Sequence, residues 1–275
     1  MNQPYVTLND GNRMPQLGFG MWKIGDSEAP TLVGQAIEIG YRSIDSAQIY
    51  ENEAGLGEAL KLSPVKREEL FITTKIWNSE QGFETTMRSF EVSMKKLGLE
   101  YLDLLLIHWP SAFRNLYSET WKALVELQKQ KRVRSIGVSN FMPANLDRII
   151  QDSGVVPAIN QIELHPCFQQ KELQGIHKKY GIQTEAWSPL GQGSLLSDST
   201  LLKIGKKYNK SSAQIILRWH LQKNFVVIPK SSNPARIAQN FQLFDFELDA
   251  SSMLEIEGMD DQKGRIGPNP DTAEF

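Results

Sequence analysis

The chain has 275 residues, of which 40% are hydrophobic, 9% aromatic and 23% charged. This length allows either two small domains or one large α/β domain, and a chain of this size can bury a substantial core. Thirty Lys and Arg against 32 Asp and Glu give a formal net charge of −2, and neither half carries a basic block. The charge pattern of a nucleic-acid-binding protein is therefore missing.

The cysteine content and the N-terminal segment restrict the class of protein further. Cys167 is the single cysteine, so it has no partner for an internal disulfide, a zinc pair or a dithiol centre. Met1–Tyr5 has no cationic segment ahead of an apolar one, and no run approaches the ~20 apolar residues that a membrane-spanning helix needs. We expect a cytoplasmic protein with no metal site, no nucleic-acid partner and no membrane partner.

Short apolar or β-branched runs are expected to form the strands. A small hairpin is predicted first, because Asp10-Gly11 supplies the positive φ angles of a tight turn between Val6–Leu8 and Arg13–Met14. Beyond it, such runs alternate with longer stretches of helical periodicity. The eight expected strands are Gln16–Gly20, Arg42–Asp45, Leu70–Lys75, Tyr101–His108, Val133–Ser139, Ala158–Glu163, Ile182–Trp187 and Phe225–Pro229.

The stretches between these strands have the pattern of helices with one buried face. Apolar residues recur at three- and four-residue spacing most clearly in Phe83–Leu97. Pro143 and Ser211 indicate two helix starts, the first through a proline in the first turn and the second through a serine cap. Similar stripes cover Glu119–Gln130, Gln169–Tyr180 and Ala213–Gln222.

Eight strand–helix units without a linker favour one α/β domain over residues 1–275, a closed (β/α)₈ TIM barrel. An open dinucleotide-binding sheet is disfavoured, because Gly18-Phe19-Gly20 continues as Met21-Trp22-Lys23 and no G-x-G-x-x-G fingerprint follows. The tail, Phe241–Phe275, ends in a stretch rich in glycine and proline. We therefore expect an N-terminal β-hairpin, the barrel, and a short C-terminal strap without regular structure.

Chemically capable side chains collect at the C-terminal ends of the expected strands, where active sites of such barrels lie. Asp45 and Tyr50 follow the second strand, Lys75 ends the third and His108 ends the fourth. A lysine inside a strand is costly to bury without an anion, and Asp45 is the natural partner. Further polar or aromatic residues lie in or directly after the later strands: Ser139, Asn140, Gln161, Trp187, Lys230 and Ser231.

Five motifs in order resemble those of the aldo-keto reductase superfamily: Asp45-Ser46-Ala47-Gln48-Ile49-Tyr50, Thr73-Thr74-Lys75, His108-Trp109-Pro110, Gly137-Val138-Ser139-Asn140 and Pro229-Lys230-Ser231. The resemblance covers essentially the whole chain. The short tail and the segment Glu185–Gly193 are most similar to the prokaryotic branch of 2,5-diketo-D-gluconate and methylglyoxal reductases.

The resemblance implies that a nicotinamide hydride reduces a carbonyl group while Tyr50 donates the proton. Lys75 would lower the pKa of the phenol, and Asp45 would hold the lysine charged. His108 would orient the carbonyl and share its developing charge. Trp187 replaces the tyrosine of many animal steroid-reducing members, so we expect a small aldehyde, an α-dicarbonyl or a keto-sugar acid as substrate rather than a steroid.

The resemblance also implies NADPH as the cofactor. Lys230, Ser231 and Arg236 match the pattern that holds its 2′-phosphate, and two cations suit a dianion. Trp187 would stack on the nicotinamide, whose carboxamide needs the donors and acceptors of amide side chains. The implied cofactor residues are Met21, Lys23, Ser139, Asn140, Gln161, Trp187, Ser188, Leu190, Gly191, Gly193, Lys230, Ser231, Arg236 and Asn240.

Several of these residues also have a structural interpretation. The Asp45–Lys75 pair could be a buried ion pair that closes the barrel and has no catalytic role. Trp22, Trp77 and Trp109, which follow the first, third and fourth strands, could pack, although the family match favours them as walls of a substrate pocket. Of the other histidines, His165 is assigned to a turn, His177 to the surface and His220 to helix packing.

Two other functions stay open at the level of the sequence. A barrel aldolase would use Lys75 as a Schiff-base nucleophile, which needs a desolvated lysine of low pKa rather than one paired with Asp45. A cofactor-bound regulatory module would have the same barrel without catalysis, which the intact set of catalytic residues argues against. No heptad seam is present, so we expect a monomer whose partner is a small-molecule carbonyl substrate.

Overall fold

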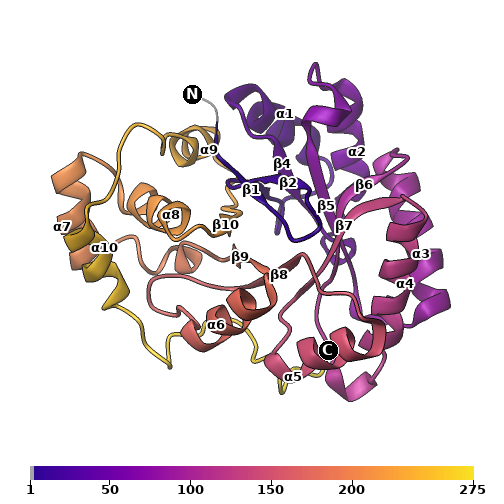
Figure 1. Ribbon diagram of the computed structural model, residues 1–275. Helices are drawn as coiled ribbons and strands as arrows, with labels where there is room; N and C mark the ends of the chain where they lie inside the picture. Colours follow the sequence, from indigo (N-terminus) through magenta and orange to yellow (C-terminus); the bar gives the residue numbers. More distant parts are fainter. Residues whose placement is uncertain (1–2) are drawn as a thin grey trace.

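The structure, a computed structural model, describes residues 3–275. Eight parallel strands form one sheet in which neighbours in the chain are neighbours in space, as predicted. Figure 1 shows the strands at the centre of the molecule with the helices around them. The strands are β3 (Phe19–Gly20), β4 (Ser43–Asp45), β5 (Phe71–Ile76), β6 (Leu102–Ile107), β7 (Val133–Ser139), β8 (Ile159–Glu163), β9 (Gln183–Trp187) and β10 (Val226–Val227).

Hydrogen bonds between the first and last strand regions close this sheet into a barrel. The amide of Gly18 donates to the carbonyl of Val227 at 2.9 Å, and the amide of Gly20 donates to that of Pro229 at 3.2 Å. The backbones approach so closely that a Cβ atom at Gly20 would lie 2.7 Å from the carbonyl oxygen of Ile228. Glycine is therefore required at the seam, and the predicted (β/α)₈ barrel is confirmed.

The predicted N-terminal hairpin covers one end of this barrel. Its strands β1 (Tyr5–Thr7) and β2 (Arg13–Pro15) pair antiparallel, and Figure 1 shows them across the middle of the ring. The Asn12 amide donates to the Ser135 hydroxyl at 3.0 Å, near the start of β7. The hairpin thus closes the end at which the strands begin and leaves the opposite end for the site.

Helices surround the strands, and their apolar faces form the outer core with the barrel. Pro143 begins one helix and the Ser211 hydroxyl caps another by accepting from the amide of Gln214, so both predicted starts are confirmed. No helix between residues 3 and 275 is long and apolar enough to cross a membrane. The helices before the tail are α1 (Ala29–Ile39), α2 (Glu53–Leu62), α3 (Phe83–Leu97), α4 (Tyr117–Lys129), α5 (Pro143–Ser153), α6 (Lys171–Tyr180), α7 (Ser199–Tyr208), α8 (Ser212–Gln222) and α9 (Pro234–Phe241).

Two sequence predictions are wrong. The tail is not irregular throughout, because it contains helix α10 (Ala250–Glu257), which lies beside α7 (Figure 1) and begins where the Asp249 carboxylate accepts from the amide of Ser252. His177 is not on the surface: its side chain is buried on α6, where the ring contacts Asn160 at 2.9 Å and Thr184 at 2.8 Å.

Candidate active site

A cavity of about 900 Å³ lies at the ends of the strands opposite the hairpin. It brings together nearly all the residues that the sequence singled out. Of the candidates, only Lys75 and Gly191 lie outside its lining: Lys75 is fully buried below it, and Gly191 lies inside the loop that borders it. The candidates on the lining are Met21, Trp22, Lys23, Asp45, Tyr50, Trp77, His108, Trp109, Ser139, Asn140, Gln161, Trp187, Ser188, Leu190, Gly193, Lys230, Ser231, Arg236 and Asn240.

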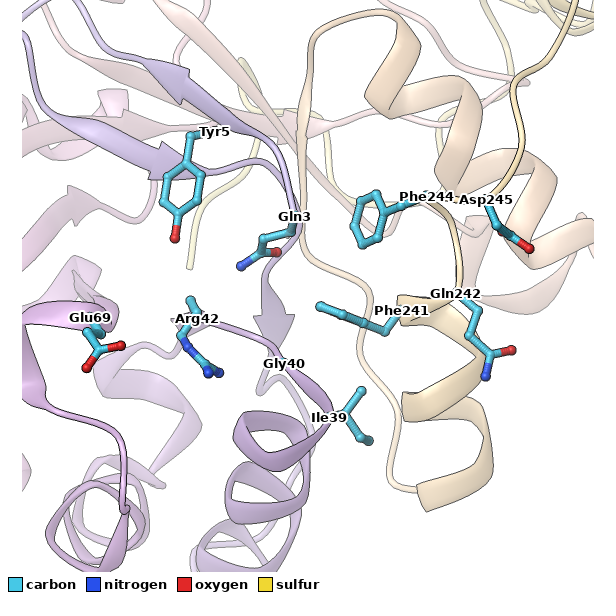
Figure 2. Close-up of a pocket in the computed structure, with 10 residues that line it drawn as sticks. All are labelled: Gln3, Tyr5, Ile39, Gly40, Arg42, Glu69, Phe241, Gln242, Phe244 and Asp245. Atoms are coloured by element: carbon cyan, nitrogen blue, oxygen red, sulfur yellow. The ribbon is translucent and has the colours of Figure 1, made fainter. Parts of the chain in front are cut away.

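Another cavity, of about 640 Å³, lies at the hairpin end of the barrel, between α1 and α9. Figure 2 shows Tyr5, Phe241 and Arg42 among its walls. The Arg42 guanidinium donates to the carbonyls of Ile37 and Tyr41, both at 2.9 Å, and thereby satisfies the end of α1. This cavity contains none of the candidate residues, so the larger cavity is the candidate functional site.

Asp45 and Lys75 form the predicted ion pair. Asp45 is the last residue of β4, and Lys75 lies in the neighbouring strand β5. The Lys75 ammonium donates to Asp45 Oδ1 at 2.5 Å and to the carbonyl of Ser46 at 2.8 Å. The ammonium nitrogen is 5.1 Å from the centre of the Tyr50 ring, which the short helix Gln48–Tyr50 brings over it. Tyr50 therefore lies between a buried cation and the cavity.

Burial and nearby charges shift the pKa values of Lys75 and Tyr50. Burial alone lowers the pKa of Lys75, but the Asp45 and Tyr50 charges and the hydrogen bond to Asp45 more than offset it, so the pKa is raised. Burial raises the pKa of Tyr50, and the Lys75 charge lowers it only in part. The predicted effect of Lys75 on the pKa of Tyr50 has the expected direction, but burial outweighs it. Both groups consequently keep their protons at neutral pH.

His108 follows β6 and faces the same part of the cavity. Its ring packs edge-on against Tyr50 and Trp77, with centroids 5.7 Å and 5.1 Å apart. Burial, and then the Lys75 charge, holds the pKa of His108 well below its ordinary value of 6.5. The ring is therefore neutral, and its Nδ1 has no hydrogen-bond partner among the described residues. A neutral imidazole beside a protonated phenol can bind one oxygen atom between them.

Gln161 on β8 links the ion pair to a further acid. Its side-chain amide donates to Asp45 Oδ2 at 2.9 Å and to Glu185 Oε2 at 3.0 Å. Glu185 lies on β9 and is fully buried. Burial, followed by the Asp45 charge, raises the pKa of Glu185 to about 8, although the Gln161 hydrogen bond and Lys75 oppose this increase. Glu185 begins the segment Glu185–Gly193, and no sequence motif indicates a role for its side chain.

Hydrogen bonds also fix the neighbouring polar residues. The Ser139 hydroxyl donates to the carbonyl of Gln161 at 2.8 Å. The Asn140 amide donates to the carbonyl of His108 at 3.0 Å, and its oxygen accepts the indole proton of Trp187 at 2.8 Å. Trp187, at the end of β9, is thus held by one edge with its ring on the cavity. Because the indole of Trp187 is held in this orientation, its flat face is available to stack on another planar ring.

The loop after β9 has an unusual backbone. Ser188 and Gln192, neither of them glycine, have positive φ angles of 48° and 52°, and Gly191 and Gly193 have φ angles of 58° and 97°. Left-handed conformations at non-glycine residues cluster where a binding site constrains the chain. Gly191 does not face the cavity, and it shapes the turn that brings its neighbours there.

Cations without anionic partners border the cavity after β10. In the part of the chain that the structure describes, neither Lys230 nor Arg236 has an ion-pair partner, although both line the cavity. Ser231 and Asn240 lie beside them on the lining. Two unpaired cations with neutral donors form a site for a dianion. The residues present therefore fit the phosphate of the implied cofactor. Within residues 3–275, no group of three or more His, Cys, Asp or Glu side chains could hold a metal ion.

Aromatic rings form the outer wall near Tyr50. Trp77 and Phe275 stack with centroids 6.0 Å apart, and Trp109 packs edge-on against Phe275 at 5.2 Å. Trp109 is 8% exposed and Trp22 is 41% exposed, so Trp22 stands at the rim and Trp109 is partly a packing residue. Phe275 was missed by the sequence analysis, because it lies almost 200 positions from Asn78, which donates to its carbonyl.

Comparisons with known proteins find relatives that match nearly the whole chain. The model of the Aldo/keto reductase family matches residues 16–261 of the chain. An aldo-keto reductase of Mycolicibacterium smegmatis is 49% identical over 272 residues, which cover 99% of this chain and 98% of that protein. The methylglyoxal reductase DkgA of Salmonella typhimurium is 48% identical over 272 residues, covering 98% of each. A crystal structure of a Gox0644 mutant in complex with NADPH has a TM-score of 0.97 and 49% identity, with 100% of both chains covered.

Proposed function

This chain belongs to the Aldo/keto reductase family of oxidoreductases, and from that premise we propose that it uses NADPH to reduce the carbonyl of a small substrate. The substrate is an aldehyde, an α-dicarbonyl or a keto-sugar acid. The observation that carries this proposal is the buried Asp45–Lys75 pair beneath Tyr50, with Tyr50 and His108 turned to one cavity.

The residues at one side of the cavity are suited to hold the cofactor. Lys230 and Arg236 would hold the 2′-phosphate, and Ser188, Leu190 and Gly193 would lie at the pyrophosphate. Trp187 would stack on the nicotinamide, and Ser139, Asn140 and Gln161 would hold its carboxamide. Bound NADPH supplies a hydride to the carbonyl carbon. The remaining lining residues that we assign to the cofactor are Met21, Lys23, Ser231 and Asn240.

Tyr50 and His108 then act on the carbonyl oxygen. Tyr50 keeps its proton at neutral pH and donates it to the oxygen as negative charge develops there. Lys75 stabilises the phenolate that remains, because its charge lowers the pKa of Tyr50. The neutral His108 ring donates to the same oxygen and fixes the carbonyl next to the phenol.

The alternatives are less compatible with the described contacts. A Schiff-base aldolase needs a neutral lysine open to substrate, whereas Lys75 is fully buried, donates to Asp45 and Ser46, and has a raised pKa. A purely regulatory module would not need a proton donor beside a buried cation. We therefore favour catalysis over binding alone.

The shape of the cavity supports a small substrate. Its volume of about 900 Å³ includes the space assigned to the cofactor, so only the remainder, lined by Trp22, Trp77 and Trp109, is left for the substrate. The walls there are flat and apolar, and Ile49 and Phe275 complete them.

The test is the consumption of NADPH, followed by its near-ultraviolet absorbance, with methylglyoxal, 2,5-diketo-D-gluconate, an aromatic aldehyde and a steroid ketone. We expect turnover with the small carbonyls and a loss of about 10²–10⁴-fold in Tyr50→Phe, whose binding of NADP⁺ is retained. Tyr101→Phe is the matched control, because the buried Tyr101 hydroxyl has no hydrogen-bond partner among the described residues. Full activity in Tyr50→Phe, or tight NADPH binding without turnover of any carbonyl, would contradict the proposal.

A further inference from the structure

We propose that Glu185 is a positioning residue of this active site, which together with Asp45 takes both amide protons of Gln161 and so presents the Gln161 carbonyl oxygen to the cavity. The inference rests on the proposed function, because the nicotinamide carboxamide is the group that this oxygen would meet. It adds a residue to the site that no sequence motif had assigned a role.

The strand register explains why Glu185 contacts Gln161. Of the two residues paired with Glu185 in the neighbouring strands, only Gln161 is polar. Gln161 on β8 is the register partner of Glu185 on one side, and Val226 on β10 is its partner on the other. The Gln161 amide nitrogen is 2.9 Å from Asp45 Oδ2 and 3.0 Å from Glu185 Oε2. The other oxygen of Glu185 is buried without a hydrogen-bond partner in the described residues. Such a costly arrangement is explained by a role in the site rather than by stability.

The two carboxyl groups decide which way the Gln161 amide points. The two ends of an amide have nearly the same shape, so only hydrogen bonds distinguish them. Two acceptors use both protons of the nitrogen, and the oxygen is left for the cavity that Gln161 lines. Without Glu185, Asp45 alone would hold the amide, and the oxygen would be fixed less firmly before the cofactor binds.

Ionisation of Glu185 adds a second consequence. The groups that face it from the surrounding elements are Asp45 on β4, Lys75 on β5 and Tyr50 after β4, while Gln161 and Val226 carry no charge. At neutral pH Glu185 keeps its proton and is uncharged, so the charge of Lys75 acts on Asp45 and Tyr50. Loss of that proton near pH 8 places a second anion there, which raises the pKa of Tyr50 and makes it a poorer proton donor.

Two substitutions separate these effects. Glu185→Gln retains an acceptor oxygen and the volume but cannot ionise, and Glu185→Leu removes the acceptor. The dissociation constant of NADP⁺, measured by quenching of tryptophan fluorescence at pH 7, should be unchanged within about twofold in Glu185→Gln and weakened about five- to tenfold in Glu185→Leu. In the pH profile of kcat/KM, we expect the wild type to decrease near pH 8 and Glu185→Gln to lack this decrease.

Glu53→Gln is the matched control, because Glu53 is also a buried acid with one oxygen that has no hydrogen-bond partner among the described residues. It lies on α2, where it accepts from Thr74 and forms an ion pair with Lys96 at 3.7 Å. We expect it to alter the melting temperature without changing the NADP⁺ affinity or the pH profile. Wild-type affinity in a folded Glu185→Leu would overturn the inference. If that variant does not fold, a Glu185→Gln profile identical to the wild type would overturn it. An inactive wild type would instead count against the proposed function and leave the binding test valid.

Discussion

The strap that follows α10 presses on Trp187, and Gly267 is the residue at that contact. The Glu163 carboxylate accepts the amide protons of Ile266 at 2.5 Å and Gly267 at 2.8 Å. A Cβ atom added at Gly267 would overlap the Trp187 ring and lie 2.9 Å from Glu163 Oε2. Trp187 cannot simply move aside, because its indole N–H is bound to Asn140. Gly267→Ala must therefore displace either the strap or the ring.

The expected cost is that of overpacking, which is typically about 1–3 kcal/mol. Each kcal/mol lowers the melting temperature by ~2–4 °C in a chain of this size. If the ring is displaced, its contact with the nicotinamide weakens too, and a loss of ~1.4 kcal/mol would raise the dissociation constant of NADP⁺ about tenfold. Differential scanning calorimetry and fluorescence titration measure the two quantities separately.

Gly258→Ala provides the matched control. Gly258 follows α10 and has a φ angle of −72°. A Cβ atom there would lie 3.5 Å from the carbonyl oxygens of Glu255 and Leu254, which is an ordinary contact. We expect this variant to keep both the melting temperature and the NADP⁺ affinity. If Gly267→Ala behaved in the same way as Gly258→Ala, the strap would not constrain Trp187 and the reasoning would be refuted.

Three further outcomes are expected. Arg236→Ala should weaken NADPH binding by about 10–100-fold while leaving NADH binding unchanged, as measured by fluorescence titration, because a charge-assisted hydrogen bond contributes about 1.5–3 kcal/mol. Trp77→Ala should raise KM for small carbonyls more than it lowers kcat, and a loss of stability with unchanged kinetics would identify Trp77 as a packing residue. Burial lowers the pKa of His177 to about 4. The buried neutral ring therefore makes its full contribution to the free energy of unfolding above the ordinary pKa of 6.5, and this contribution is lost as the pH falls toward 4. Urea unfolding should show this loss, up to about 3 kcal/mol, and His177→Gln should show less of it.

The parts of the fold that the sequence predicts best have strong local signals. The predicted bounds of α3 agree with the structure at both ends, because its apolar stripe is regular and glycines flank it at residues 82 and 98. Helix α10 has no comparable stripe, since only Ser252 and Ile256 are buried on it, and this is why the tail was predicted to be irregular. Its stability comes from tertiary contacts with α7, which a single sequence does not show.

The candidate site shows the same division between local and tertiary information. The Asp45–Lys75 pair was predictable, because a buried lysine requires an anion. Glu185 gave no comparable signal, because its significance depends on the register that places it opposite Gln161. The net pKa shift of Tyr50 was also out of reach, since it depends on how completely the ring is buried as well as on Lys75.

The cations of the site divide into two kinds, and the division separates chemistry from affinity. Lys75 is fully buried and compensated by Asp45, so its charge acts on Tyr50 at short range and is screened little by salt. Lys230 and Arg236 lie on the open part of the cavity without anionic partners among residues 3–275, so their attraction for an anion is exposed to screening. Binding of a phosphorylated cofactor should therefore depend on ionic strength, whereas proton donation by Tyr50 should not. A barrel that fixes one cation in its core and leaves two in the segment after β10, Lys230 before α9 and Arg236 on it, can change its cofactor preference without disturbing its proton donor.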